Sequence, residues 1–178
     1  MRLRLKTFFR RYSFYLGGDQ PSVTWGERFR SGVGAFIGLL LVIAAAQFLG
    51  EFSGVEEWLM ASLGASALLV FALPQSPMSQ PWAVIAGNTL SALVGITTFH
   101  FIGQSLLAIP VAASLSILGM FILRCLHPPA AAVALIAVLS HIGSYQYAFF
   151  PVMVDSILLT LVGAAYSNIT GKRYPNKP

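Results

Sequence analysis

The stretch LRCLHPPAAAVALIAV, Leu123–Val138, decides how this chain folds, because it places two consecutive prolines before a run of small apolar residues. Proline lacks an N–H group and has a fixed φ angle, so it suits the first turn of a helix and disrupts the interior. Pro128 and Pro129 are therefore predicted to begin a short helix. Its first free N–H groups, from Ala130 and Ala131 onward, lie at the positive end of the helix dipole, which predicts a backbone site for an anion. The alternative is that the prolines only separate two packed helices.

The composition indicates an integral membrane protein. Hydrophobic residues make up 56% of the 178 residues and charged residues only 10%, whereas about a quarter of a soluble domain is charged. We therefore expect an all-α polytopic membrane protein in which residues 25–171 form one transmembrane domain in contact with lipid. Residues 1–24 are predicted to be a basic segment, either amphipathic on the cytoplasmic leaflet or disordered, and residues 172–178 a basic cytoplasmic tail.

The positive charge is concentrated at the two ends of the chain. The net charge is +5, with seven Lys or Arg residues before the first apolar run and three after the last. Flanks rich in Lys and Arg stay on the cytoplasmic side of a membrane. Both termini are therefore predicted to be cytoplasmic, with an even number of crossings. This distribution is a topology signal, so no nucleic-acid partner is expected.

Apolar runs divide the transmembrane domain into four long helices and two short ones. Each long run holds about 20 residues, which gives roughly 30 Å of helix and matches the hydrocarbon thickness. The long runs are Ser31–Gly50, Trp82–Ile102, Ser105–Leu123 and Ala148–Asn168. The short runs, Trp58–Leu73 and Pro128–Ser140, are bracketed by Pro, Gly, Ser or His and are predicted to be broken half-helices.

The order long, short, long occurs twice, which predicts two three-element repeats. The third elements share a pattern, TLSALVG at Thr89–Gly95 and ILLTLVG at Ile157–Gly163. If the short elements cross the membrane, the repeats are inverted and the chain crosses six times; if they re-enter, it crosses four times. Arg124 favours six crossings, because only that model places it on the cytoplasmic side.

The first short run offers a counterpart to the helix that the prolines begin. In SLGASALLVFALP, Ser62–Pro74, Gly64 and Ala65 allow close approach and Ser66 supplies a hydroxyl donor. Transporters with broken helices bind anions where two helix starts face each other near the midplane. We therefore predict that helix starts near Gly64 and Pro129 face one cavity.

Two segments carry a resemblance to a known family. HPPAAAVAL, His127–Leu135, and GASALLVFALPQSPMSQPWAVIAGNTLSALVGI, Gly64–Ile96, resemble the HPP family of integral membrane proteins, and the resemblance covers most of the chain after Trp25. It implies a small polytopic protein of the bacterial inner membrane and a role in transport, since plastid and cyanobacterial relatives are associated with nitrite transport. Relatives often have glycine in the run after the prolines, where this chain has only alanine. The family motif falls on His127, Pro128 and Pro129, and the upstream signature on Gly64, Ala65, Ser66, Ser76, Pro77, Gln80, Pro81, Gly87 and Asn88.

Four polar side chains are candidates for binding or pairing. Arg124 is predicted either to pair with a passing anion or to anchor the chain at the lipid headgroups. His127 either donates to an anion, carries a proton or caps the helix. Asp155, inside a long apolar run, is predicted to carry a proton or to pair with His127 or Arg124, and the alternative is a purely structural role. Asn88 is predicted to bond either a substrate or another helix.

These observations favour a transporter or channel for a small inorganic anion, nitrite-like, that is bound at half-helix N-termini. The alternative is a membrane sensing or scaffold module without transport. An enzyme is not expected, because the three histidines lack a metal-ligand motif and no Ser or Cys has an evident base. No cofactor is expected either. A small bundle with broken helices is predicted to form a homodimer or a larger homo-oligomer.

Overall fold

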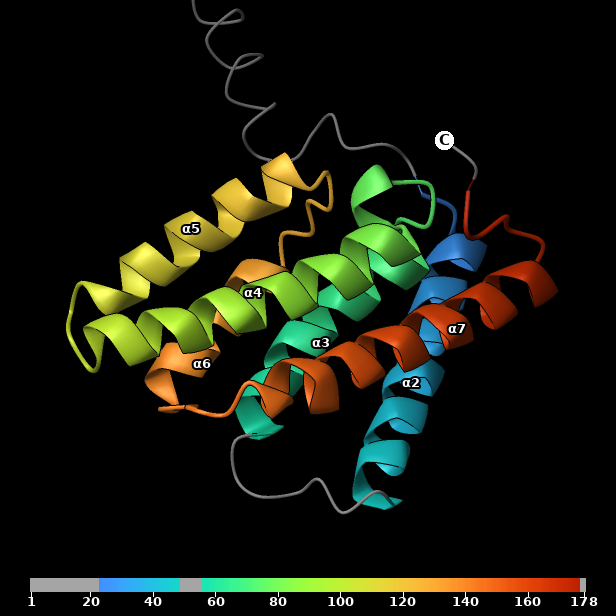
Figure 1. The fold of residues 1–178 in the computed structure, drawn as a ribbon. Coiled ribbons are helices and arrows are strands. Elements are labelled where there is room, and N and C mark those ends of the chain that lie inside the picture. Colours follow the sequence, from blue (N-terminus) through green and yellow to red (C-terminus); the bar gives the residue numbers. More distant parts are fainter. Residues whose placement is uncertain (1–22, 49–55, 177–178) are drawn as a thin grey trace, which may run out of the picture.

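The chain folds into a bundle of helices joined by short turns (Figure 1). The structure, a computed structural model, describes residues 23–48 and 56–176. The predicted basic segment before residue 23 therefore lies outside the described residues, whereas the predicted all-helical membrane architecture is confirmed. In chain order the elements are α2 (Trp25–Phe48), α3 (Glu56–Ala72), the 3-10 turn η1 (Pro77–Ser79), α4 (Pro81–Ile102), α5 (Ala108–Ile122), α6 (Ala130–Leu139), the π-helical turn η2 (Ala148–Met153) and α7 (Val154–Ile169).

Three helices in the described part of the chain are long and apolar enough to span a bilayer: α2 with 24 residues, α4 with 22, and η2 with α7, together 22. The prediction of a fourth long helix at Ser105–Leu123 is wrong, because α5 has 15 residues, or about 22 Å. α5 begins only at Ala108, because the chain first forms a turn at Ser105. In this turn the carbonyl and hydroxyl oxygens of Ser105 both accept from the N–H group of Ala108. Arg124 ends it, with a left-handed φ of 51°.

The last span is broken rather than continuous. Pro151 lies inside η2, and Phe150 before it has φ −140° and ψ 111°, which is not helical. Proline removes a backbone donor and disfavours helical angles in the preceding residue. The prediction of one uninterrupted helix over Ala148–Asn168 is therefore wrong at its first turns, although α7 continues regularly from Val154.

Successive helices run in opposite directions. The side chain of Arg30, near the start of α2, donates from Nη2 to the carbonyl of Phe71 at the end of α3, at 3.0 Å. The indole of Trp82, at the start of α4, donates to the carbonyl of Leu123 after α5, at 3.2 Å. Tyr166, near the end of α7, donates from its hydroxyl to the carbonyl of Arg30 at 2.8 Å. The starts of α2 and α4 thus lie at the same end of the bundle as the ends of α3, α5 and α7 (Figure 1). Six crossings require this arrangement. The number of crossings itself stays a prediction.

The third helix of each half packs against the other half. α4 contacts α5 and α6, while α7 contacts α2 and α3. Gly95 on α4 lies against α6, where an added Cβ would be 2.5 Å from the carbonyl oxygen of Ala134. Gly163, which occupies the matching position on α7, lies against α3, where a Cβ would be 2.3 Å from Val70. This exchange is the packing expected of two repeats related by a two-fold axis.

Glycines also set the distance between α2 and α3. The ring of Phe71 fills the space that Cβ atoms at Gly34 and Gly38 would occupy, at 2.7 and 2.5 Å. Such close approach of two backbones is the usual role of small residues in membrane helices. The other faces of the helices expose large apolar side chains to the surroundings, as a lipid-facing surface requires; examples are Phe36, Leu40, Leu41, Leu118, Phe121 and Leu161.

Candidate functional site

His127 lies at the junction of α3, η1 and α6. Its side chain is fully buried, and its Nδ1 lies 2.8 Å from the carbonyl oxygen of Met78. A carbonyl oxygen only accepts, so Nδ1 carries the hydrogen. In the neutral ring Nε2 then accepts from the hydroxyl of Ser66, at 2.8 Å. Both ring nitrogens are therefore used inside the protein, where they tie three segments together; a role in binding an anion stays a prediction.

The start of α6 follows the two prolines, as predicted, but its N–H groups are not free. The N–H groups of Ala130, Ala131 and Ala132 donate to the carbonyl oxygens three residues earlier, at 2.9, 3.3 and 3.1 Å. The expectation of open backbone donors is therefore wrong for this structure. The reason is that Pro129 has helical angles, φ −60° and ψ −25°, so the chain already turns before α6 and brings these carbonyls within reach.

The second predicted helix start, near Gly64, does not exist. Gly64, Ala65 and Ser66 lie inside α3, where their backbone belongs to a continuous helix. The predicted meeting of the two short elements is nevertheless present, through side chains. Ser62 donates from its hydroxyl to the carbonyl oxygen of Pro129 at 3.0 Å, next to the bond between Ser66 and His127. Two serines one helical turn apart thus hold the start of α6 against α3.

Asn88 and Ser156 meet where α4 and α7 cross. The amide of Asn88 donates from Nδ2 to the hydroxyl oxygen of Ser156 at 3.0 Å, and this hydroxyl donates to the carbonyl of Val152 at 2.8 Å. Oδ1 of Asn88 is buried and has no hydrogen-bond partner within the described ranges. Such an atom is costly in an apolar interior, so it marks a place where a polar partner would be favourable.

Asp155 lies beside this contact on α7. Its side chain is 1% exposed and that of Asn88 is 2% exposed. Buried acids in membrane helices commonly belong to ion or proton pathways, so the predicted functional role of Asp155 stays a prediction. Other polar residues are buried elsewhere in the described part of the bundle, between several pairs of helices and near its ends. They are Ser62, Ser66, Ser79, Ser91, Thr98, Ser116, His127, Ser156, Thr160 and Ser167.

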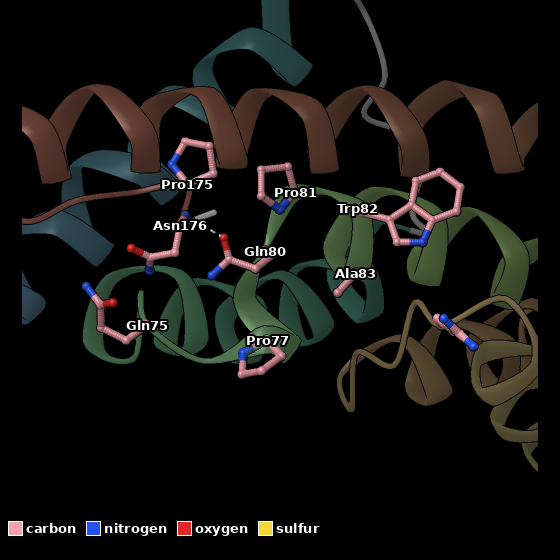
Figure 2. A pocket seen from close by; sticks show the side chains of 9 residues that line it. Gln75, Pro77, Gln80, Pro81, Trp82, Ala83, Pro175 and Asn176 are labelled. Atoms are coloured by element: carbon pink, nitrogen blue, oxygen red, sulfur yellow. Dashed lines mark hydrogen bonds between the residues drawn. The ribbon is translucent and has the colours of Figure 1, made fainter. Parts of the chain in front are cut away.

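Arg124 lies away from this interior, in a pocket at the end of the bundle where α4 begins. The pocket has a volume of about 510 Å³. Figure 2 shows the hydrogen bond from the backbone N–H group of Asn176 to Oε1 of Gln80, with Gln75 beside them and Trp82 on the opposite side of the pocket. Three amide side chains and one guanidinium line a pocket that is otherwise apolar, and the guanidinium is the group that would attract an anion. The lining consists of Gln75, Pro77, Gln80, Pro81, Trp82, Ala83, Arg124, Pro175 and Asn176.

Sequence reasoning missed the role of the C-terminal tail. Tyr174 is 1% exposed and donates from its hydroxyl to the carbonyl of Ser79 at 2.8 Å. Asn176 donates from Nδ2 to the carbonyl of Pro74 at 2.9 Å. The tail therefore closes over the turn between α3 and α4 and forms one wall of the pocket. The available signal in the sequence was Tyr174, an aromatic residue that follows Lys172 and Arg173 in an otherwise basic tail.

The fold and the apolar helices define a helical membrane protein with several polar side chains buried in its interior. Residues 20–175 match the family described as "HPP, transmembrane region", so the chain belongs to the HPP transmembrane family. It is also similar to two proteins of Dictyostelium discoideum described as transmembrane proteins. One is 33% identical over 97% of this chain and 59% of its own length; the other is 31% identical over 76% of this chain and 50% of its own length. This chain thus spans between half and three fifths of those relatives. No solved structure matches it.

Proposed function

We propose that this membrane protein moves a small inorganic anion, nitrite-like, across the bilayer. The observation that carries the proposal is the contact of Asn88 with Ser156, beside Asp155, in the interior between the two halves. Transporters built from two repeats bind their substrates near the midplane at the repeat interface. Polar side chains at such a depth are costly and are kept mainly where a solute or proton passes.

The pocket around Arg124 supports the choice of an anion. A guanidinium at the mouth of a cleft attracts negative ions from solution. The pocket shares its wall with the His127 junction, because η1 contributes Pro77 to the lining and the carbonyl of Met78 to His127. In this proposal an anion enters beside Arg124, and the His127 junction separates that entrance from the polar interior around Asn88. The nitrite-like specificity comes from the family resemblance alone.

The proposal includes the orientation and assembly of the protein. The basic flanks support a cytoplasmic position for both termini, and the alternating helix directions support six crossings. α5 and α6 have 15 and 10 residues, too few to span about 30 Å alone. A second copy that covers these short helices would shield their ends from lipid, so a homodimer or larger assembly in a bacterial inner membrane is part of the proposal.

Anion flux in proteoliposomes tests the function. The parent protein should move nitrite, with nitrate and chloride as competing anions and sodium as the cation control. Asn88→Leu should reduce the flux at least tenfold, because it removes the polar contact at the interface. Ser114→Leu is the matched control, since Ser114 is an exposed serine on α5, and its flux should equal that of the parent. Flux of sodium alone, or no flux of any ion by folded protein, contradicts the proposal, and the second result favours the sensing or scaffold module.

A further inference from the structure

A second pocket lies at the same end of the bundle, between the start of α2, the end of α3 and the C-terminal tail. Its volume is about 470 Å³, and Gln75 lines both this pocket and the one that contains Arg124. No part of the proposed transport path uses it. The polar side chains in its lining belong to Glu27, Arg30, Ser31, Gln75, Ser76 and Lys172.

Arg30 is held rigidly at this pocket. Its Nη2 donates to the carbonyl of Phe71 at 3.0 Å, and its own carbonyl accepts from the hydroxyl of Tyr166 at 2.8 Å. Its Nε and Nη1 are buried and have no hydrogen-bond partner among residues 23–48 and 56–176. A guanidinium keeps its charge at every physiological pH, so donors left in this state are costly. The guanidinium is therefore positioned, charged and incompletely satisfied.

Within residues 23–48 and 56–176, the lining of this pocket does not carry a full set of counter-charges. Lys172 forms an ion pair with Glu27, so one carboxylate faces two cations. The lining therefore carries an excess of one positive charge, together with the hydroxyl groups of Ser31 and Ser76 as further donors. Hydroxyl and guanidinium donors around a cavity are the groups that bind phosphate and other oxyanions.

The pocket lies at the level where lipid headgroups meet a membrane protein. Arg30 follows Trp25 and Phe29, whose side chains are 81% and 77% exposed, at the start of a helix long enough to span a bilayer. Exposed aromatic residues at the end of such a helix mark the interface between lipid and water. A phosphate group can reach Arg30 there from a phospholipid or from solution.

We propose that the pocket around Arg30 binds a phosphate group, carried either by the headgroup of an anionic phospholipid or by a soluble phosphate. Arg30 and Lys172 supply the charge, Ser31 and Ser76 supply hydroxyl donors, and Glu27 competes with the ligand for Lys172. The site is separate from the path of the transported anion, so its test does not depend on transport.

The test uses the purified full chain in a neutral detergent at fixed ionic strength. Binding is measured as the rise in melting temperature during titration with inorganic phosphate in one arm and with dihexanoyl-phosphatidylglycerol in the other. Dihexanoyl-phosphatidylcholine, whose phosphate is neutralised within its own headgroup, is the lipid control. Arg30→Gln should weaken binding about tenfold, the loss expected for a hydrogen bond to a charged group. Glu27→Gln should strengthen it, because it removes the competing carboxylate.

Arg28→Gln is the matched control. Arg28 lies in the same turn of α2, is exposed, and stacks on the ring of Trp25 with 4.8 Å between its Cζ atom and the ring centroid. This change removes the same charge outside the pocket, so binding should be unchanged. If Arg30→Gln does not fold, Lys172→Gln takes its place and should also weaken binding. Saturation by phosphatidylglycerol alone assigns the site to lipid, and saturation by inorganic phosphate assigns it to a soluble ligand. No binding in either arm, or equal losses in Arg28→Gln and Arg30→Gln, overturns the proposal.

Discussion

Asn88 and Ser156 hydrogen-bond to each other, at 3.0 Å between Nδ2 and Oγ. They are 68 residues apart, which is also the offset between Thr89–Gly95 and Ile157–Gly163. In the two repeats predicted from the sequence these positions are equivalent, and equivalent positions touch only at the axis that relates two repeats. The predicted axis would therefore pass through this contact, and Gly95 and Gly163, which are also 68 residues apart, pack against α6 and α3. The repeats themselves stay a prediction.

The contact between Asn88 and Ser156 should be measurable as a coupling energy. In a double-mutant cycle with Asn88→Ala and Ser156→Ala, the coupling should be roughly 0.5–1.5 kcal/mol, as for other hydrogen bonds between membrane helices. The free energy of unfolding is measured by SDS titration in mixed micelles. Asn88→Ala combined with Ser114→Ala on the exposed face of α5 should be additive. A coupling energy of zero between Asn88 and Ser156 would contradict a stabilising hydrogen bond between these two side chains.

Alanine at Gly95 or Gly163 should lower stability by about 1–3 kcal/mol, because each added Cβ meets atoms of the facing helix at 2.5 Å or less. Gly64→Ala is the control, since nothing lies within 4 Å of a Cβ there. That change should be neutral or slightly stabilising, as alanine favours helix more than glycine does. Thermal unfolding in detergent compares the three variants. Equal effects at all three positions would contradict the packing.

Removal of the His127 side chain should destabilise the protein more than removal of the Ser66 hydroxyl. His127→Ala loses two hydrogen bonds, leaves the carbonyl of Met78 without its donor and opens a cavity where the fully buried ring was, at a cost of about 2–4 kcal/mol. Ser66→Ala loses one bond, at about 1 kcal/mol. SDS titration measures both. A His127→Ala variant as stable as the parent, yet without flux, would instead identify the histidine as a ligand for the anion.

Cysteine labelling tests the direction of the helices. With the buried Cys125 replaced by alanine, single cysteines at Gln75 and Arg173 should label from one side of the membrane. Cysteines at Gln104 and Ser144, which are exposed in the turns after α4 and α6, should label from the other side. Labelling of Gln75 and Ser144 from the same side would rule out six crossings and favour re-entrant short helices.

Tyr174→Phe should loosen the C-terminal tail and change the response to alkaline pH. Burial raises the pKa of Tyr174 above its ordinary value of about 10, because the charged form is poorly solvated. The folded state therefore favours the protonated phenol, whose contribution is complete below pH 10 and is lost as the pH rises above 10. Tyr174→Phe should cost about 1 kcal/mol at pH 7 and flatten the decline above pH 10. Tyr145→Phe, which changes an exposed phenol, should keep the parental slope.

Three features could be predicted from the amino-acid sequence: that the chain is helical, that it belongs in a membrane, and where several helices begin. These features depend on neighbours along the chain. Pro128 and Pro129 fix the start of α6 because a fixed φ and a missing N–H group act within one turn. The apolar runs that became α2 and α4 are long enough to be recognised by length alone. The family also followed from two segments of sequence.

Which side chains meet, and which donors remain free, depends on how the helices pack against one another. Helix faces in a membrane protein are apolar both toward lipid and toward the interior, so periodicity does not reveal which face packs. Nothing in the sequence therefore paired Asn88 with Ser156, or Arg30 with Phe71. The helical angles of Pro129 allow the N–H groups at the start of α6 to donate to preceding carbonyls, and these angles depend on how α3 and η1 pack around His127. The burial of Tyr174 likewise depends on how the C-terminal tail packs against η1.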